Sequence, residues 1–224
     1  MSEAGASNVS FYGNIIQDIQ GTAIWTFNTG GRPSNVLVYN NVLLYTSGSS
    51  RPGTSNGIFA CINSGSVCTN IRFIGNTVIN GHSDYSGAFG IRDENGSGSW
   101  VWQNNLFYAT QANAVGFSTR GSTFTEDHNS WLNSGSPASG SADVMVSSGA
   151  PNPFVNWTGY DFHLATQNAY WSAGATLPSP YNMDLAGNSR PGSDGAWNRG
   201  AFEYGSSQQQ DGPIPPTTLT TMAR

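Results

Sequence analysis

The chain has 224 residues, of which 9% are charged and 12% aromatic, and its formal net charge is −5. All of its basic residues are Arg and they form no basic run, so the phosphate neutralisation that dominates nucleic-acid binding is not expected. No apolar run approaches the roughly 20 residues of a membrane-spanning helix, and the 28 glycines indicate a turn-rich β protein.

One pattern of apolar residues and asparagine recurs along the chain. Two apolar residues alternate, an asparagine follows three positions later, and another apolar residue comes two positions after that. The copies begin at Val9, Val36, Ile71, Trp100 and, in a weaker form, Phe124. Their asparagines are Asn14, Asn41, Asn76, Asn105 and Asn129. Constant strands separated by loops of unequal length are the organisation of a solenoid.

The fixed asparagine predicts a turn after each strand, because Asn tolerates left-handed backbone angles and bonds its own backbone. Stacked Asn side chains can also hydrogen-bond to one another along a stack of strands. The sequence therefore predicts an all-β fold, a right-handed parallel β-helix (solenoid) of about five coils with an asparagine ladder. We expect Asn41, Asn76 and Asn105 to stack at one corner with inward side chains.

A second strand is expected in each coil, at 23–27, 57–61, 87–91 and 113–117. Aligning these segments forms two inward columns, one of Trp25, Phe59, Phe89 and Val115, and one of Phe27, Cys61, Ile91 and Phe117. The column between them holds the small residues Thr26, Ala60, Gly90 and Gly116. We expect this column to form an outer strip where a ligand approaches the backbone, with loops 45–56 and 80–86 as one wall of a groove.

The composition changes near Pro151, and residues 205–224 are rich in Gln, Pro and Thr. We therefore divide the chain into β-helix coils at 1–150, a C-terminal closing segment of the same domain at 151–204, and a disordered tail at 205–224. The closing segment is expected to cover the apolar columns at the C-terminal end of the stack. Only eight residues precede the first copy, so we expect an exposed N-terminal end. Either the natural protein continues upstream and this chain is a fragment or a short paralogue, or two chains associate end to end, which is the outcome we favour.

The closing segment contains PNPFVNWTGYDFHL, DLAGNSRP and GAFEY. Together with the repeats, these motifs resemble secreted bacterial β-helix proteins of the pectin-lyase-like superfamily over nearly all of 8–204. The resemblance implies a polysaccharide lyase, glycoside hydrolase, esterase or non-enzymatic adhesin, and fold alone does not choose among them. It also implies a structural role for Asp161, His163, Asp184, Arg190 and Glu203 in the closing segment.

The candidate catalytic residues lie in the third coil and are His82, Asp84, Arg92, Asp93 and Glu94. Glycoside hydrolysis needs one protonated and one ionised carboxyl group. Lyase chemistry needs a base and a cation that neutralises the substrate carboxylate, and Arg or a carboxylate-held Ca²⁺ can supply that cation. The same residues also fit a solvated turn with local salt bridges, so both interpretations stay open.

Aromatic faces suit the apolar faces of sugars, so Tyr45 and Tyr85 are expected to bind substrate. Arg51 is the third expected substrate-binding residue, because its side chain can reach toward the groove. Glu126 occupies a position that is apolar in the other copies, which indicates either a functional buried carboxylate or the frayed end of the solenoid. Cys61 and Cys68 are spaced for a local disulfide, which favours an oxidising compartment. No signal peptide is visible, so we expect a secreted protein whose signal is absent from this chain.

The expected function is polysaccharide cleavage, by a lyase or a glycoside hydrolase, in an extracellular carbohydrate-active protein with its groove at the third coil. The alternatives are a non-catalytic carbohydrate-binding or adhesive module and a structural end piece of a larger secreted protein. The sequence leaves open whether the chain is an enzyme. It identifies no metal-ligand set and no cofactor beyond the Ca²⁺ that the third-coil carboxylates can hold.

Overall fold

The computed structural model describes the backbone of residues 7–17, 24–27, 34–45, 59–62, 68–81, 91–93, 98–110, 118–119, 123–133 and 140–205. Within these ranges, the backbone alone is described for residues 24–27, 45, 59–62, 91–93, 118–119 and 123–124. The tail predicted at 205–224 lies outside the described residues apart from Gly205.

The described structure is essentially all-β, with three parallel sheets that each take every third strand of the chain, apart from β15, which follows β14 in the second sheet. The first sheet has the order β1 (Ser7–Tyr12), β4 (Ser34–Tyr39), β7 (Thr69–Ile74), β10 (Ser99–Gln103) and β13 (Thr123–Asp127). The second has the order β15 (Val144–Val146), β14 (Ser130–Leu132), β11 (Leu106–Ala109), β8 (Thr77–Asn80), β5 (Val42–Tyr45) and β2 (Ile15–Gln17). The third has the order β12 (Ser118–Thr119), β9 (Ile91–Asp93), β6 (Phe59–Ile62) and β3 (Ile24–Phe27). This confirms the predicted all-β class and the solenoid-like stacking of parallel strands.

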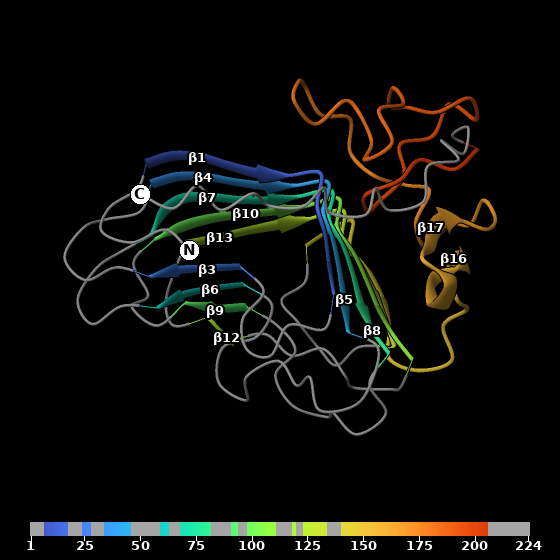
Figure 1. The fold of residues 1–224 in the computed structure, drawn as a ribbon, viewed down its shortest axis with the longest axis horizontal. Helices are drawn as coiled ribbons and strands as arrows, with labels where there is room; N and C mark the ends of the chain where they lie inside the picture. Colours follow the sequence, from blue (N-terminus) through green and yellow to red (C-terminus); the bar gives the residue numbers. More distant parts are fainter. Residues whose placement is uncertain are drawn as a thin grey trace, which may run out of the picture.

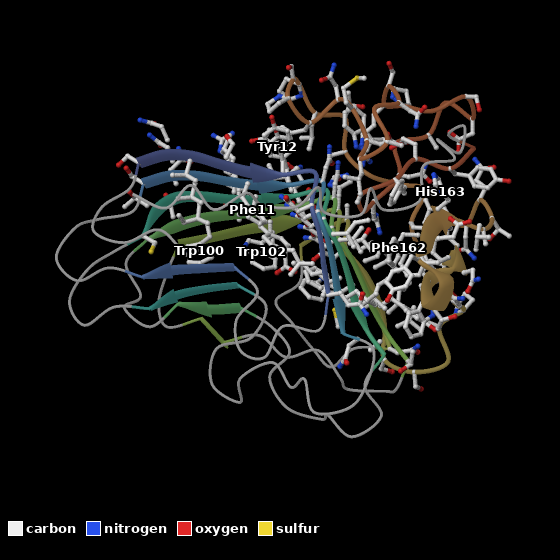
Figure 2. The ribbon with its side chains drawn as sticks, viewed as in Figure 1. Phe11, Tyr12, Trp100, Trp102, Phe162 and His163 are labelled. Atoms are coloured by element: carbon white, nitrogen blue, oxygen red, sulfur yellow. The ribbon has the colours of Figure 1, made fainter. Side chains whose placement is uncertain are left out.

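The strands of the first sheet pair in the register of the sequence repeat. Val36 pairs with Val9 on one side and with Ile71 on the other, and Trp100 pairs with Ile71 and Phe124. Because strand side chains alternate between faces, each of these columns lies on one face of the sheet. The buried face packs between the sheets, as Figure 2 shows for Phe11, Trp100 and Trp102.

Each strand of the first sheet ends in a tight turn that leads into the second sheet. The residue before the repeat asparagine has a positive φ in all five turns, at Gly13, Asn40, Gly75, Asn104 and His128. The residue with left-handed backbone angles is therefore the one directly before the fixed asparagine. The sequence prediction assigned these angles to the fixed asparagine itself, which is wrong. Gly and Asn suit the position because other L-residues adopt positive φ at a steric cost.

Five fixed residues, the inner asparagines, follow these turns: Asn14, Asn41, Asn76, Asn105 and Asn129. The side-chain Nδ2 of Asn41 donates to Oδ1 of Asn76 at 2.9 Å, and Asn76 donates in the same way to Asn105 at 3.2 Å. The same oxygens accept the backbone N–H of the preceding inner asparagine, at 3.0 Å and 2.9 Å. These bonds satisfy buried polar groups that the turns leave without a strand partner.

The third sheet differs from the predicted register. Trp25 pairs with Ala60 and not with Phe59, a shift of one residue, while Phe59 pairs with Ile91 and not with Phe89, a shift of two. These strands have two to four residues. In the sequence, Asn28 stands three residues after Trp25 and Asn63 three residues after Ala60, so aligning these asparagines gives the observed pairing. The prediction aligned the large residues instead.

The one-residue shift has a consequence for the predicted strip of small residues, because it moves side chains to the opposite face. Ala60 stands beside Trp25 and Arg92, and Thr26 stands beside Cys61. Thr26 and Ala60 are therefore not in one column, and the predicted small-residue strip is wrong.

The central strands of the second sheet are buried on both faces. Leu43, Val78 and Phe107 pack inward, whereas Leu44, Ile79 and their neighbours pack against the closing segment. The closing segment begins with the antiparallel strands β16 (Phe154–Asn156) and β17 (Asp161–Leu164), separated by the 3₁₀ turn η1 (Trp157–Gly159). Figure 1 shows this segment, in orange and red, outside the sheet that contains β5 and β8. Figure 2 shows Phe162 directed at that sheet.

The closing segment therefore covers the side of the second sheet, and the expectation that it covers the end of the stack is wrong. The physical reason is the composition of the covered strands, such as VLLY and LFYA, whose outer face is as apolar as their inner face. Strands buried on both faces have continuous apolar runs. The segment is fastened at the turns, where Asn40 Nδ2 donates to the Met183 carbonyl at 2.6 Å and Asn104 Nδ2 to the Ala175 carbonyl at 2.7 Å.

A buried ion pair holds the closing segment together. Arg190 Nη1 lies 2.8 Å from Glu203 Oε1, and both side chains are almost completely buried. The other Glu203 oxygen accepts Nδ2 of Asn198 at 2.9 Å, and Arg190 also donates to the carbonyls of Asn198 and Gly200. Arg190 and Glu203 thus organise the backbone of the final loop, from Pro191 to Phe202.

Candidate functional site

The residues predicted to carry catalysis lie largely outside the described structure. His82, Asp84 and Glu94 are outside the described residues, as are the predicted sugar-binding residues Arg51 and Tyr85. Only the backbone is described for the remaining three, Arg92 and Asp93 on β9 and Tyr45 at the end of β5. Tyr45 lies in the second sheet, whereas Arg92 and Asp93 lie in the third.

The two cysteines are described to different extents. Cys68 is buried, with 2% of its surface exposed. The backbone of Cys61 belongs to β6, and its side chain is outside the described residues. The pairing predicted between Cys61 and Cys68 therefore stays a prediction.

A groove of about 420 Å³ lies between the outer face of the first sheet and the closing segment. We call it the outer groove. Its floor comes from β1, β4 and β7, and its wall from residues 178–181. The residues that line it are Asn8, Ser10, Asn35, Leu37, Asn70, Arg72, Pro178, Ser179, Pro180 and Tyr181.

Three of these residues, the outer asparagines Asn8, Asn35 and Asn70, occupy equivalent positions on neighbouring strands. Their φ angles are 61°, 54° and 53°, a left-handed conformation that Asn tolerates better than most residues. Asn35 Nδ2 donates to Asn8 Oδ1 at 3.0 Å, and Asn70 Nδ2 donates to Asn35 Oδ1 at 2.5 Å. Neighbouring strands are about 4.8 Å apart, so these amides form a regular row on the sheet surface.

A cationic and an aromatic group border this row. Arg72 on β7 is exposed and donates from Nε to Asn70 Oδ1 at 3.2 Å, and no described carboxylate forms a salt bridge with it. Tyr12, 58% exposed, stacks on Tyr39 with ring centroids 4.8 Å apart, and Tyr39 contacts the groove residue Tyr181 edge to face. Figure 2 shows Tyr12 on the outer side of the first sheet, toward the closing segment. The outer face thus combines amides, a guanidinium group and an exposed ring.

Glu126 is a second polar feature, on β13 and in register with Trp102. Both of its carboxyl oxygens are shielded from solvent and have no hydrogen-bond partner among the described residues. Burial, followed by the nearby Asp143 carboxylate, raises the pKa of Glu126 to about 9, so its carboxyl group is protonated at neutral pH. Oxygens without solvent access do not form a substrate-facing site within the described structure.

The sequence prediction missed the outer groove, although the repeat contained its signal. Ser-Asn or Thr-Asn stands directly before the first apolar residue in three copies, at Ser7-Asn8, Ser34-Asn35 and Thr69-Asn70. Extending the repeat by two residues upstream would have found this second row of asparagines. The contribution of residues 178–181 has no counterpart in the repeat, because it depends on how the closing segment packs.

The comparisons with known proteins give no match: no protein-family model, no curated protein and no solved structure matches this chain. Among the described residues, no cluster of His, Cys, Asp and Glu has the geometry of a metal site. No helix in the described part of the chain is long and apolar enough to cross a membrane.

Proposed function

We propose that this chain is a right-handed parallel β-helix of about five coils, of the kind found in the pectin-lyase-like superfamily. The parallel sheets support this fold, because each takes one strand in turn as the chain advances. The hydrogen bonds that join the inner asparagines from Asn14 to Asn129 support an asparagine ladder at the corner between the first two sheets. The repeats and the closing-segment motifs support the superfamily.

The function that fits this fold best is extracellular polysaccharide binding, with the outer groove as the binding site. The observation that carries the proposal is the row of outer asparagines beside Arg72 and the exposed Tyr12 ring. Amide and guanidinium groups bond sugar hydroxyls, and a tyrosine face packs on the apolar face of a sugar ring. A non-catalytic binding module needs nothing further from the site.

Cleavage of the same polymer is the second candidate function. It is supported by the position of Arg92 on β9, between the small residues Ala60 and Ser118 of the neighbouring strands, with Asp93 next to it. In this proposal Asp84, Asp93 and Glu94 supply the carboxyl groups for hydrolysis or hold Ca²⁺ for lyase chemistry. This site belongs to the third sheet, so it is separate from the outer groove on the first.

An extracellular location is part of the proposal, and it rests on the cysteines. Disulfides persist in oxidising compartments. We propose that Cys61 and Cys68 form one. Mass spectrometry of the unreduced, alkylated protein should find the two cysteine peptides joined within one chain. Alkylation of both thiols would contradict the pairing.

Binding is tested by titrating the protein with a panel of neutral and acidic polysaccharides, with and without EDTA. We expect at least one polysaccharide to bind, and Arg72→Gln to weaken its affinity roughly tenfold through lost hydrogen bonds. Asn182→Ala is the matched control, since Asn182 is exposed and outside the groove. No binding to any member of the panel under either condition would reject the proposal.

Cleavage is tested on the same polysaccharides by assaying reducing ends and unsaturated products. If the third coil is catalytic, Asp93→Asn should abolish product formation while polymer binding at the outer groove persists. Binding without any product supports the non-catalytic module. Full activity in both Asp93→Asn and Asp84→Asn would remove the third-coil site.

A further inference from the structure

We infer that the outer groove binds a linear, extended polysaccharide that lies across the strands, with one sugar ring at each of three outer asparagines. This inference rests on the proposed polysaccharide binding and specifies its geometry. It starts from the register, which places Asn8, Asn35 and Asn70 on three successive strands. A ligand that follows this row meets the same chemical group at each strand, about every 4.8 Å, which is comparable to the length of one sugar ring.

The bonding capacity that each outer asparagine retains supports this arrangement. A carboxamide has two N–H donors and an oxygen with two lone pairs. Asn35 uses one N–H toward Asn8 and one lone pair toward Asn70, and both bonds run along the row. One N–H and one lone pair therefore remain on this exposed side chain. A sugar hydroxyl, which both donates and accepts, can use the two together.

The other direction offers no such repeat. A polymer running along β1 meets Asn8, then Ser10, then Tyr12, three groups of different size and chemistry. Only the direction across the strands presents equal groups at equal intervals. The groove has its wall at residues 178–181, so the ligand is confined on one side along the row.

Among the described strands, the row has three members. On β10 the equivalent position holds Ser99, whose hydroxyl oxygen already accepts the backbone N–H of Asn70 at 2.9 Å. Arg72 Nε donates to Asn70 Oδ1, so one lone pair of that oxygen is already used. Three rings therefore saturate the row, and a chain that coils between successive rings does not keep in register with it.

The test is calorimetric titration with cello-, xylo- and manno-oligosaccharides of increasing length, and with malto-oligosaccharides as the coiled series. In the series whose polymer binds, affinity should rise at each added ring up to three and change less than about threefold per ring beyond that, where only statistical gains remain. The malto series should bind at least about tenfold more weakly at three rings.

Asn35→Gly isolates the row, because glycine adopts the positive φ of Asn35 without strain while removing the amide. It should weaken three-ring ligands about tenfold and leave the unfolding temperature nearly unchanged. Asn182→Ala serves as the control, and Asn8→Gly as a second variant should shorten the length dependence from three rings to two.

The outcomes separate this inference from the proposed function. If polysaccharides bind but affinity is independent of length, or is unchanged in Asn35→Gly, the row does not read the polymer and the inference is overturned. If no saccharide of any class binds, the proposed function itself fails. An equally tight malto series would overturn the claim of an extended ligand.

Discussion

Asparagine acts in two ways in this chain, and its surroundings decide which. Asn76 is completely buried, and its amide donates to the Val38 carbonyl and to Asn105 while its oxygen accepts twice from Asn41. No bonding capacity of that amide is directed to solvent. Asn35 has the same chemistry on the exposed face, where the amide retains a donor and a lone pair. The inner residue serves stability and the outer one is available to a ligand.

Asn76→Ala should therefore destabilise the fold. The substitution leaves the backbone N–H of Asn41 without its acceptor and removes the side-chain donor to the Val38 carbonyl, at a cost of about 1–3 kcal/mol. Asn105 Oδ1 loses the side-chain bond but keeps the backbone N–H of residue 76. Urea unfolding measures the change. Asn182→Ala, on an exposed residue, should stay within about 0.5 kcal/mol of the native protein. Equal effects in the two variants would show that the inner bonds contribute nothing specific.

Glu126→Gln should change the pH dependence of stability. The fold raises the pKa of Glu126 from 4.5 to about 9, mainly through burial, so the folded state binds a proton that the unfolded state releases between these values. A raised carboxyl pKa gives stability that is complete below the unfolded pKa and is lost as pH rises toward the folded one. The unfolding midpoint of the native protein should decrease as the pH is raised from about 5 to about 9. Glu126→Gln should be more stable than the native protein at neutral pH and depend less on pH, whereas parallel curves would contradict this.

At the scale of single elements, an anchor in the sequence decided which strand registers could be predicted. The first sheet carries a fixed asparagine after every strand, and Val36 and Ile71 pair as the repeat predicts. The prediction aligned the short strands of the third sheet by their large residues, which placed Trp25 beside Phe59. An asparagine also stands directly after β3 and β6 in the sequence, and aligning these two asparagines gives the observed pairing of Trp25 with Ala60. The fixed asparagine supplies a single reference point that hydrophobic alternation alone does not.

The placement of the closing segment required a signal that is not periodic. VLLY and LFYA are apolar on both faces, which indicates that something covers the outside of these strands. The sequence does not say which segment provides the cover, because that depends on packing between residues far apart, such as Leu44 and Phe162. The outer groove depends on the same packing, since Tyr181 reaches it from the closing segment.

Glu203→Gln tests how the closing segment is held. The substitution removes the charged salt-bridge partner of the buried Arg190 guanidinium and leaves Asp184 as a nearby carboxylate, which should cost up to about 3–5 kcal/mol. Asp194→Asn is the matched control, because Asp194 lies in the same segment, is half-buried and is in no described salt bridge. Thermal unfolding followed by tryptophan fluorescence should report the difference, since Trp171 and Trp197 are buried in this segment. A Glu203→Gln variant as stable as the control would show that the ion pair is not needed.

At the scale of the whole molecule, burial increases from the first strands to the middle of the stack. Phe11 and Ile16 in β1 and β2 are only half-buried, whereas their equivalents Phe73 and Val78 in β7 and β8 are fully buried. β1 and β2 are also edge strands with a partner on one side only among the described strands. In a stack where each strand contacts only its neighbours, local opening starts at such an end.

Hydrogen exchange should therefore be fastest in β1 and β2 and slowest in β8 and β11, by one to several orders of magnitude if the end opens independently. The measurement is mass spectrometry of exchanged peptides at low protein concentration, with light scattering on the same sample. A concentration-dependent gain of protection in β1 and β2, together with a doubled mass, would show a second copy covering the exposed Ile15 edge, as the sequence led us to expect. Equal protection of all strands in a monomer would contradict the predicted gradient, because an uncovered edge strand has too few contacts to match the centre of the stack.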